Sequence, residues 1–394
     1  MSNSNNRLRV LASGIFCLMV TLGIARFAYT PMMPIMFEQA GLTKVWAGWL
    51  ATINYLGYML GALTATLVGN LLLKDRIYRA GLLLAVMTTL MMGLSDNPWL
   101  WALSRFIAGF STASGLLIGS GLMLNWLLRH NHRGEMGIHF SGMGLGIVVV
   151  ALVVGYSEPL AWAQQWCLLG VLGMVFVIPA WRWLPRPETS TMTHLGEALQ
   201  DRPPSRRFFW LMMLVYFCGG FGFVISATYI VAIVENQPAL QGQGDLAFLL
   251  LGLCAVPACI AWDLISRKIG VLNALFCAYF IHALGIVLPA LADSLLFALL
   301  SAALYGFTFV GIVSIVLTMA GRFYPTKPAK LMGTLTMSYG VPQIIAPTIA
   351  GYLARETGHY NGALYMASAF VVLGLVAIMA IKRWAADDIR LLTD

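Results

Sequence analysis

The sequence predicts an all-α polytopic membrane protein with twelve transmembrane helices, arranged as two six-helix bundles that are parallel pseudo-repeats. Of the 394 residues, 59% are hydrophobic and only 10% are charged, whereas about a quarter of a soluble domain is charged. Apolar stretches of about 20 residues, the length that crosses a bilayer, recur along the chain. Basic residues fall almost entirely between alternate pairs of these stretches, as is typical of a multi-pass protein.

The apolar stretches, and the Gly and Pro residues between them, predict where each span lies. The expected ranges are about 9–36, 45–72, 79–95, 99–128, 135–156, 164–183, 208–234, 245–266, 270–291, 295–320, 331–354 and 362–383. Continuous apolar runs exclude the alternating strands of a membrane β-barrel. The first run lacks a cleavage pattern, which favours an uncleaved helix over a signal peptide.

The distribution of Lys and Arg predicts the orientation of the chain. Twenty of the 24 basic residues lie in the termini and in the loops that a cytosolic N-terminus places in the cytosol. The loops expected outside hold only Lys44 and Arg355, and the remaining two, Arg26 and Arg105, lie inside spans. Because cytosolic loops carry the excess of basic residues, we expect both termini in the cytosol.

The longest polar stretch, 184–207, predicts a cytosolic linker between an N-terminal bundle, 1–183, and a C-terminal bundle, 208–394. A constant shift of 197 residues superimposes the halves. It aligns Gly23 with Gly220, Glu38 with Glu235, Asp96 with Asp293, Ser104 with Ser301 and Gly109 with Gly306. Six spans separate the matched positions, so the halves have the same topology, and a substrate site is expected between them near the bilayer midplane.

Several function classes lack their sequence signals. All six cysteines fall inside spans without CxxC spacing, so neither a metal site nor a disulfide framework is expected. The net charge is +8, but the basic residues are scattered over short loops and form no single patch, which argues against nucleic-acid binding. The sequence has neither a phosphate-binding glycine loop nor a His, Asp and Glu cluster at membrane depth, so we expect no cofactor and no enzyme activity.

Four local motifs resemble those of the major facilitator superfamily. Leu103-Ser-Arg105-Phe-Ile-Ala-Gly109 matches the superfamily's fourth-helix pattern of an arginine four residues before a glycine. The loop expected between spans two and three, Gly69 to Arg79, resembles the G-x-x-x-D-R-x-G-R-R signature, with Tyr78 in place of a glycine. The fifth span is glycine-rich over residues 139–146, like the superfamily's fifth-helix motif, but it lacks the Gly-Pro pair associated with antiporters.

The fourth motif, Ala25-Arg-Phe-Ala-Tyr-Thr-Pro31, is similar to the bacterial YbfB/YjiJ-type branch. The resemblance implies a monomeric secondary transporter of a small-molecule substrate in the bilayer of the bacterial inner membrane. It also implies that spans 1, 4, 7 and 10 line a central cavity.

The two arginines inside spans suggest the substrate. Arg26 and Arg105 both lie toward the outer half of their spans, and neither helix has a carboxylate at comparable depth. Two buried guanidinium groups repel, and an anion gripped by both relieves the repulsion. We therefore expect a small organic or inorganic anion. Two structural alternatives stay open: Arg105 hydrogen-bonds the backbone of the first span, or Arg26 extends outward past Tyr29.

Helical spacing and span position supply the remaining candidates. Substrate-binding residues are expected among Arg26, Tyr29, Thr30, Asn54, Tyr58, Arg105, Thr112, Phe223, Ser226, Tyr305, Thr308, Tyr339 and Gln343. Cytosolic gate ion pairs are expected among Asp75, Arg76, Arg79, Asp263 and Arg267, and proton coupling at His139, Glu38 or Glu235. Proton-coupled efflux of amphipathic or hydrophobic compounds and a non-transporting membrane sensor remain as alternatives.

Overall fold

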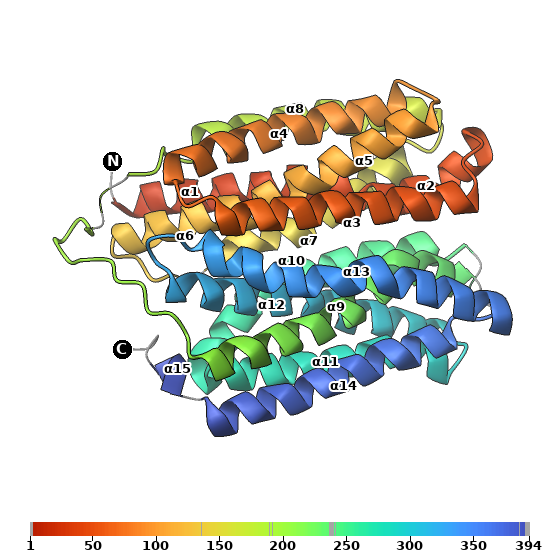
Figure 1. Ribbon diagram of the computed structural model, residues 1–394. Coiled ribbons are helices and arrows are strands. Elements are labelled where there is room, and N and C mark those ends of the chain that lie inside the picture. The colour runs from red at the N-terminus through yellow and green to blue at the C-terminus, as the bar shows by residue number, and fades with distance from the viewer. Residues whose placement is uncertain are drawn as a thin grey trace. The chain divides into compact units, whose positions relative to one another are not determined.

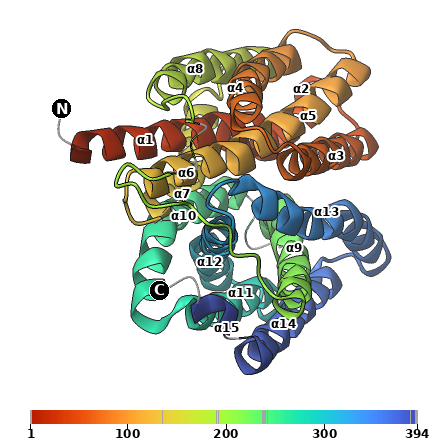
Figure 2. The same ribbon diagram turned by 60° about the vertical axis from the view of Figure 1, so that its left-hand side comes forward.

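The computed structural model describes residues 3–134, 136–188, 190, 192–235, 240, 242–385 and 387–390. Within these ranges the chain is almost entirely helical, and its β-structure is one isolated bridge between Met192 and Ala198. The contacts divide the chain into two units (Figures 1 and 2). Unit 1 contains residues 1–201 and 320–334, and unit 2 contains residues 202–319 and 335–394.

Unit 1 contains six long helical segments within its described residues. The first is built from α1 (Asn3–Leu18), the π-helical η1 (Met19–Phe27) and α2 (Tyr29–Gln39), and it is followed by α3 (Lys44–Leu67) and α4 (Leu71–Gly93). The fourth segment consists of α5 (Pro98–Ala113), the π-helical η2 (Ser114–Gly119) and α6 (Ser120–Arg129), and α7 (Gly137–Tyr156) and α8 (Trp162–Arg182) complete the six.

Six long helices and one short helix form the rest of the described chain. They are α9 (Arg206–Glu235), α10 (Gly244–Ile269), α11 (Val271–Leu291), α12 (Leu295–Phe323), α13 (Ala329–Thr357), α14 (Asn361–Trp384) and α15 (Asp387–Arg390). The segment Ala320–Thr334, which joins α12 to α13, packs with unit 1.

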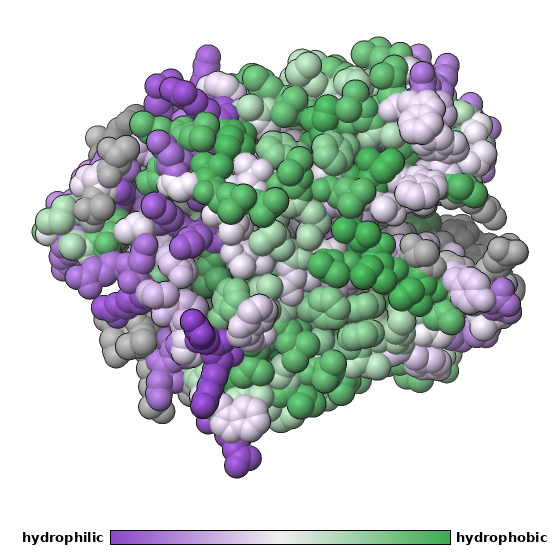
Figure 3. All heavy atoms as spheres, in the orientation of Figure 1, coloured by the Kyte–Doolittle hydropathy of each residue, from purple (hydrophilic) through white to green (hydrophobic). Residues whose placement is uncertain are grey.

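The helices have the length and surface of membrane spans. Ten helical segments of the described chain are long and apolar enough to cross a bilayer, and α4 and α13 are as long but more polar. Large apolar side chains such as Leu83, Val175 and Val376 are about half exposed, and hydrophobic side chains cover the middle stretches of the helices in Figure 3. Lipid is the solvent that such a surface requires. The predicted all-α polytopic class is confirmed.

The start of α4 differs from the prediction. The residues from Leu71 to Arg79 are helical, although a loop is expected there from the sequence. Asn70 begins the helix, because its side chain accepts a hydrogen bond from the backbone N–H of Leu73 at 3.0 Å. Hydropathy placed the start eight residues too late, since the first turns of α4 carry Lys74, Asp75, Arg76 and Arg79.

Glycines set how closely the helices cross. A Cβ on Gly109 of α5 would overlap the backbone carbonyl oxygen of Asn54 on α3. In unit 2, a Cβ on Gly306 of α12 would overlap the carbonyl oxygen of Leu251 on α10. Gly306 and Leu251 each lie 197 residues after their counterparts in unit 1, so the two units repeat this crossing.

Candidate functional site

Arg105 on α5 is a buried arginine of unit 1. Only 3% of the residue is exposed. Its Nη1 donates a hydrogen bond to the carbonyl oxygen of Ala25 at 2.9 Å, and the centre of the Tyr29 ring lies 4.6 Å from its guanidinium carbon. Its Nε is buried without a hydrogen-bond partner. Arg105 therefore makes the backbone contact expected of the structural alternative and still has an unused donor.

Arg26 on η1 lies among aromatic rings. The ring centres of Tyr58, Tyr55 and Phe27 are 4.9, 5.0 and 5.7 Å from its guanidinium carbon. Only 7% of the residue is exposed, so its side chain does not extend outward to solvent. The negative ring faces stabilise the buried cation through cation–π interactions.

Irregular helix geometry brings the first and fourth segments together. In η1 the backbone bonds skip one residue more than in an α-helix, as between the Ala28 N–H and the Gly23 carbonyl at 3.0 Å. The carbonyl oxygen of Thr21 accepts a bond from the Thr112 hydroxyl at 2.8 Å. Both arginines therefore lie where a π-helical segment meets α5.

Asn54 links α3 to the backbone of α5. Its amide donates to the backbone carbonyl of Arg105 at 2.8 Å, and the small Gly109 lets the two helices approach. Thus α3 supplies both the hydrogen bond that orients the backbone of Arg105 and the Tyr55 and Tyr58 rings around Arg26.

The electrostatics of this cluster favour an anion. The charge of Arg26 repels that of Arg105, and both groups are buried, where the repulsion is weakly screened. The hydrogen-bond acceptors described for the Arg105 guanidinium are backbone carbonyl oxygens, which carry only partial charge. A carboxylate or a similar oxyanion could accept hydrogen bonds from the Arg105 Nε and offset the repulsion.

The other residues predicted in unit 1 mostly serve the packing. The Tyr29 hydroxyl donates to the carbonyl oxygen of Ala47 at 3.1 Å, while Thr30 is half-buried at the start of α2. Asn54 and Thr112 bond to backbone, as described above. Sequence reasoning missed Tyr55, although its spacing of three residues from Tyr58 places both on one helix face.

The residues predicted in unit 2 form a row of rings. Tyr339 stacks on Tyr216 with ring centres 4.4 Å apart, and Phe223 lies 5.6 Å from both Tyr339 and Phe309. The Tyr305 ring stacks on Phe309 at 5.2 Å.

Hydrogen bonds fix the positions around this row. The Tyr305 hydroxyl donates to the carbonyl oxygen of Phe223 at 2.7 Å, and Thr308 bonds to His282 at 2.8 Å. Gln343 donates to the carbonyl oxygen of Tyr339 at 3.1 Å, and Ser226 is buried. The row is therefore buried, and the hydroxyl of Tyr305 is engaged by the backbone.

Of the residues predicted to gate the transporter, Asp75 and Arg79 form an ion pair one helical turn apart, with Nε and Oδ2 separated by 3.0 Å. Arg79 also donates to the carbonyl oxygens of Trp181 and Leu184, at 2.7 and 3.1 Å, and so ties α4 to the end of α8. Arg76 is exposed. In unit 2, Asp263 is half-buried and Arg267 is exposed, one turn apart in α10.

The three predicted coupling residues have different surroundings. His139 on α7 is fully buried, and its Nε2 lies 2.6 Å from the Ser120 hydroxyl, while its Nδ1 has no hydrogen-bond partner. Glu38 is exposed near the end of α2. The side chain of Glu235 lies outside the described residues.

Known transporters resemble this chain in sequence and in fold. The chain matches the family described as "Uncharacterised MFS-type transporter YbfB" over residues 18–379. It is 22% identical to the "Uncharacterized MFS-type transporter YceJ" of Bacillus subtilis over 380 residues, which cover 93% of this chain and 95% of that protein.

Two further relatives have names that include a substrate. The chain is 23% identical to the "Gentisate transporter" of Corynebacterium glutamicum, covering 88% of this chain and 82% of that protein. It is 22% identical to the "Probable sulfoacetate transporter SauU" of Cupriavidus necator, covering 95% and 94%. Among solved structures, the nucleoside transporter NupG shares the fold, with a TM-score of 0.64 and 15% identity over 95% of this chain and 98% of that one. The predicted resemblance is confirmed.

Proposed function

Because this chain belongs to the family of MFS-type transporters represented by YbfB, we propose that it is a secondary active transporter that moves a small organic anion by alternating access. Arg26 and Arg105 of unit 1 hold the anion. The observation that carries this proposal is the pair of buried guanidinium groups, together with the unused Nε donor of Arg105.

The geometry of arginine suits such a ligand. A guanidinium group presents parallel N–H donors that match the two oxygen atoms of a carboxylate or a sulfonate. Tyr55, Tyr58 and Phe27 surround the cation of Arg26, and the backbone bond to Ala25 fixes Arg105. Part of the ordering cost of binding is therefore met before the anion arrives.

The names of two relatives support the substrate class. Gentisate and sulfoacetate are both organic anions, and the proteins named for them match most of this chain at 22–23% identity. This similarity supports an anionic substrate and does not select one compound.

The remaining roles belong to the same proposal. Asp75 and Arg79, with Asp263 and Arg267, act as gate residues, and His139 carries the coupling proton beside Ser120. The chain lies in the inner membrane with both termini in the cytosol, as its basic residues predict. The N-terminal bundle, 1–183, and the C-terminal bundle, 208–394, are the moving bodies, joined by the linker 184–207.

The aromatic row of unit 2 favours a second candidate, proton-coupled efflux of amphipathic compounds. Rings from Tyr216 to Tyr305 offer an apolar face, which suits a ligand with a hydrophobic part. An imposed pH gradient separates this candidate from anion uptake, since efflux moves compound against the proton flux.

The test is uptake into proteoliposomes. Vesicles containing the purified protein are offered a panel of labelled aromatic and aliphatic carboxylates and sulfonates, with and without a pH gradient. We expect at least one anion to accumulate, and Arg26→Gln to abolish its accumulation. The matched control is Arg206→Gln, which removes an exposed arginine at the start of α9. Accumulation that is unchanged in Arg26→Gln would contradict the proposal.

A further inference from the structure

Lys74 is a buried cation in the polar first turns of α4. It precedes the apolar stretch 79–95 that is expected to cross the bilayer, yet only 1% of the residue is exposed. Within the described residues its Nζ has no hydrogen-bond partner. A buried ammonium group that has lost its water and gained no partner is strongly destabilising. The protein atoms around Lys74 therefore leave its charge uncompensated.

The carboxylate that follows Lys74 in the chain is already engaged. Both oxygen atoms of Asp75 accept hydrogen bonds from the Nε of Arg79, at 3.1 and 3.0 Å. The influences that act on the charge of Lys74 are burial and a second lysine, Lys327. Asp75 therefore belongs to the pair with Arg79 and does not neutralise Lys74.

Lys327, in the segment that joins α12 to α13, brings a second cation to the same place. Its charge repels that of Lys74. A Cβ on Gly69 would lie 3.5 Å from the Nζ of Lys327, so this ammonium group lies beside the backbone that leads into α4. Burial and Lys327 lower the pKa of Lys74 to about 8, which leaves its amine mostly protonated at neutral pH. Two like charges thus meet at one helix end.

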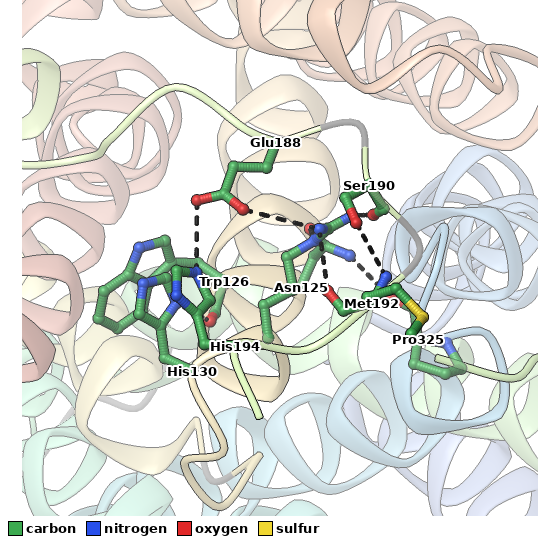
Figure 4. Close-up of polar contacts among 9 residues, drawn as sticks. Asn125, Trp126, His130, Glu188, Ser190, Met192, His194 and Pro325 are labelled. Carbon is green, nitrogen blue, oxygen red and sulfur yellow. Dashed lines mark hydrogen bonds and ion pairs between the residues drawn. The ribbon is translucent and has the colours of Figure 1, made fainter. Parts of the chain in front are cut away.

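Hydrogen bonds fix the chain on the N-terminal side of Lys327. The Asn125 amide of α6 donates to the carbonyl oxygen of Pro325 at 2.8 Å (Figure 4). The Thr326 hydroxyl donates to the carboxylate of Asp201 at 2.7 Å. The two residues before Lys327 are therefore attached to other parts of unit 1, and neither attachment involves the side chain of Lys327.

Packing fixes the chain on the other side of Lys327. A Cβ on Gly333, near the start of α13, would overlap the carbonyl oxygen of Ala62 on α3, so the two helices touch through a glycine. The contacts of unit 1 thus hold Lys327 near Lys74 against the repulsion of their charges. A ligand of opposite charge would relieve that repulsion.

The space beside Gly69 gives such a ligand access. Apart from the chain neighbours of Gly69, the Nζ and Cε of Lys327 are the only described atoms within 4 Å of the position that a Cβ there would occupy. Gly69 and Lys327 are both exposed. The Lys327 side chain can therefore swing aside and admit a small anion to the start of α4.

A phosphate group is the anion that suits these cations. The ammonium group of a lysine is a compact point charge with three donors, which binds phosphate oxygens without the planar geometry of an arginine. Two such groups match the charge of a phosphate monoester, about −1.5 to −2 at pH 7. The positive end of the α4 dipole favours the same ligand.

We propose that Lys74 and Lys327 form a binding site for a phosphate group at the start of α4. The bound phosphate bridges the two ammonium groups and so joins α4 to the segment between α12 and α13. Neither Arg26 nor Arg105 takes part in this site. Inorganic phosphate in solution and the phosphate monoester of a lipid headgroup offer the same chemistry at this position.

Equilibrium binding of radiolabelled inorganic phosphate to the full-length protein, in a neutral detergent without lipid, tests the site. At constant ionic strength we expect saturable binding that Lys74→Met and Lys327→Gln each weaken by about tenfold, because each change removes a charge-assisted hydrogen bond. Lys330→Gln is the matched control, since it removes an exposed lysine of the same segment. This control and Arg26→Gln should bind phosphate within about twofold of the wild-type protein.

A second measurement separates the two sources of phosphate. The protein is placed in phosphatidylcholine nanodiscs with and without phosphatidic acid, and native mass spectrometry detects the phosphatidic acid that it retains. Binding of inorganic phosphate that requires Lys74 assigns the site to phosphate in solution. Phosphatidic acid that is retained by the wild-type protein and lost from Lys74→Met, without binding of inorganic phosphate, assigns the site to a lipid headgroup.

Two results would overturn the proposal: neither form of phosphate binds, or binding is equal in the wild-type protein and Lys327→Gln. Lys327 is exposed, so Lys327→Gln provides a folded variant even if Lys74→Met does not fold. Failure of anion uptake with intact phosphate binding would reject the proposed function and leave this site standing, because the two proposals use different residues.

Discussion

The two units share a helix crossing and surround it with different chemistry. In unit 1 the crossing of Gly109 on the Asn54 carbonyl lies beside two buried arginines. In unit 2 the equivalent crossing of Gly306 on the Leu251 carbonyl lies beside aromatic rings. The position 197 residues after Arg26 is Phe223. The repeated scaffold therefore does not require the charge, which points to a role for the charge in binding.

Among the changes that distinguish unit 1 from unit 2, Arg105→Gln should have the largest effect on anion binding. The change removes a buried charge and the fork proposed to bind the oxyanion, which should weaken anion binding by about 2 kcal/mol, or roughly 30-fold. The loss of affinity is measured by equilibrium binding of a transported anion to the wild-type protein and the variant. Ala302→Gln, at the equivalent position of unit 2, is the control, and similar losses from the two variants would remove the distinction between the units.

Gly109→Ala and Gly306→Ala test the shared scaffold. Each added methyl group meets a backbone carbonyl, so each should lower the free energy of unfolding by about 1–3 kcal/mol. Thermal unfolding in detergent checks both. Gly155→Ala is the control, because a Cβ there meets nothing within 4 Å. The shared crossing would be in doubt if Gly306→Ala melted like Gly155→Ala.

Tyr55→Leu tests the aromatic contacts of the Arg26 guanidinium. Loss of a ring 5.0 Å from Arg26 should cost about 1 kcal/mol of anion affinity, roughly fivefold, because Arg26 loses a cation–π contact that positions it. Tyr55→Phe keeps a ring and should bind nearly as the wild type does. Titration with the transported anion distinguishes the variants, and equal losses from both would assign the effect to the hydroxyl.

Tyr305→Phe should give the smallest effect, and in stability alone. The change deletes the bond from the hydroxyl to the Phe223 carbonyl oxygen, which should cost about 1 kcal/mol. Thermal unfolding should report the loss, while affinity for an aliphatic anion should stay within about twofold. A large loss of affinity would place the substrate's contacts in unit 2.

The fold could be predicted because the bilayer imposes simple rules on the sequence. Long apolar runs and the distribution of basic residues are local signals, and they gave the number and type of the helices. Arg26 and Arg105 could be found for the same reason, since a charge inside an apolar run is conspicuous. The start of α4 could not, because charged residues at a helix end lower the hydropathy that marks the span.

Contacts between distant segments were beyond sequence reasoning. Nothing local places Tyr55 against Arg26, or the Thr112 hydroxyl on the Thr21 carbonyl. The hydrogen bonds from the Arg129 guanidinium to the carbonyl oxygens of Ser190 and Met192 join residues about 60 positions apart. The π-helical form of η1 likewise has no counterpart in hydropathy.

Direct binding of a transported anion to Arg26→Gln and Phe223→Leu tests the central claim, that unit 1 alone supplies the charge that holds the substrate. These variants change equivalent positions of the two units. The account predicts that Arg26→Gln weakens binding by about 30-fold or more, and that Phe223→Leu binds within about threefold of the wild-type protein. Unchanged affinity in Arg26→Gln, with a large loss in Phe223→Leu, would contradict it.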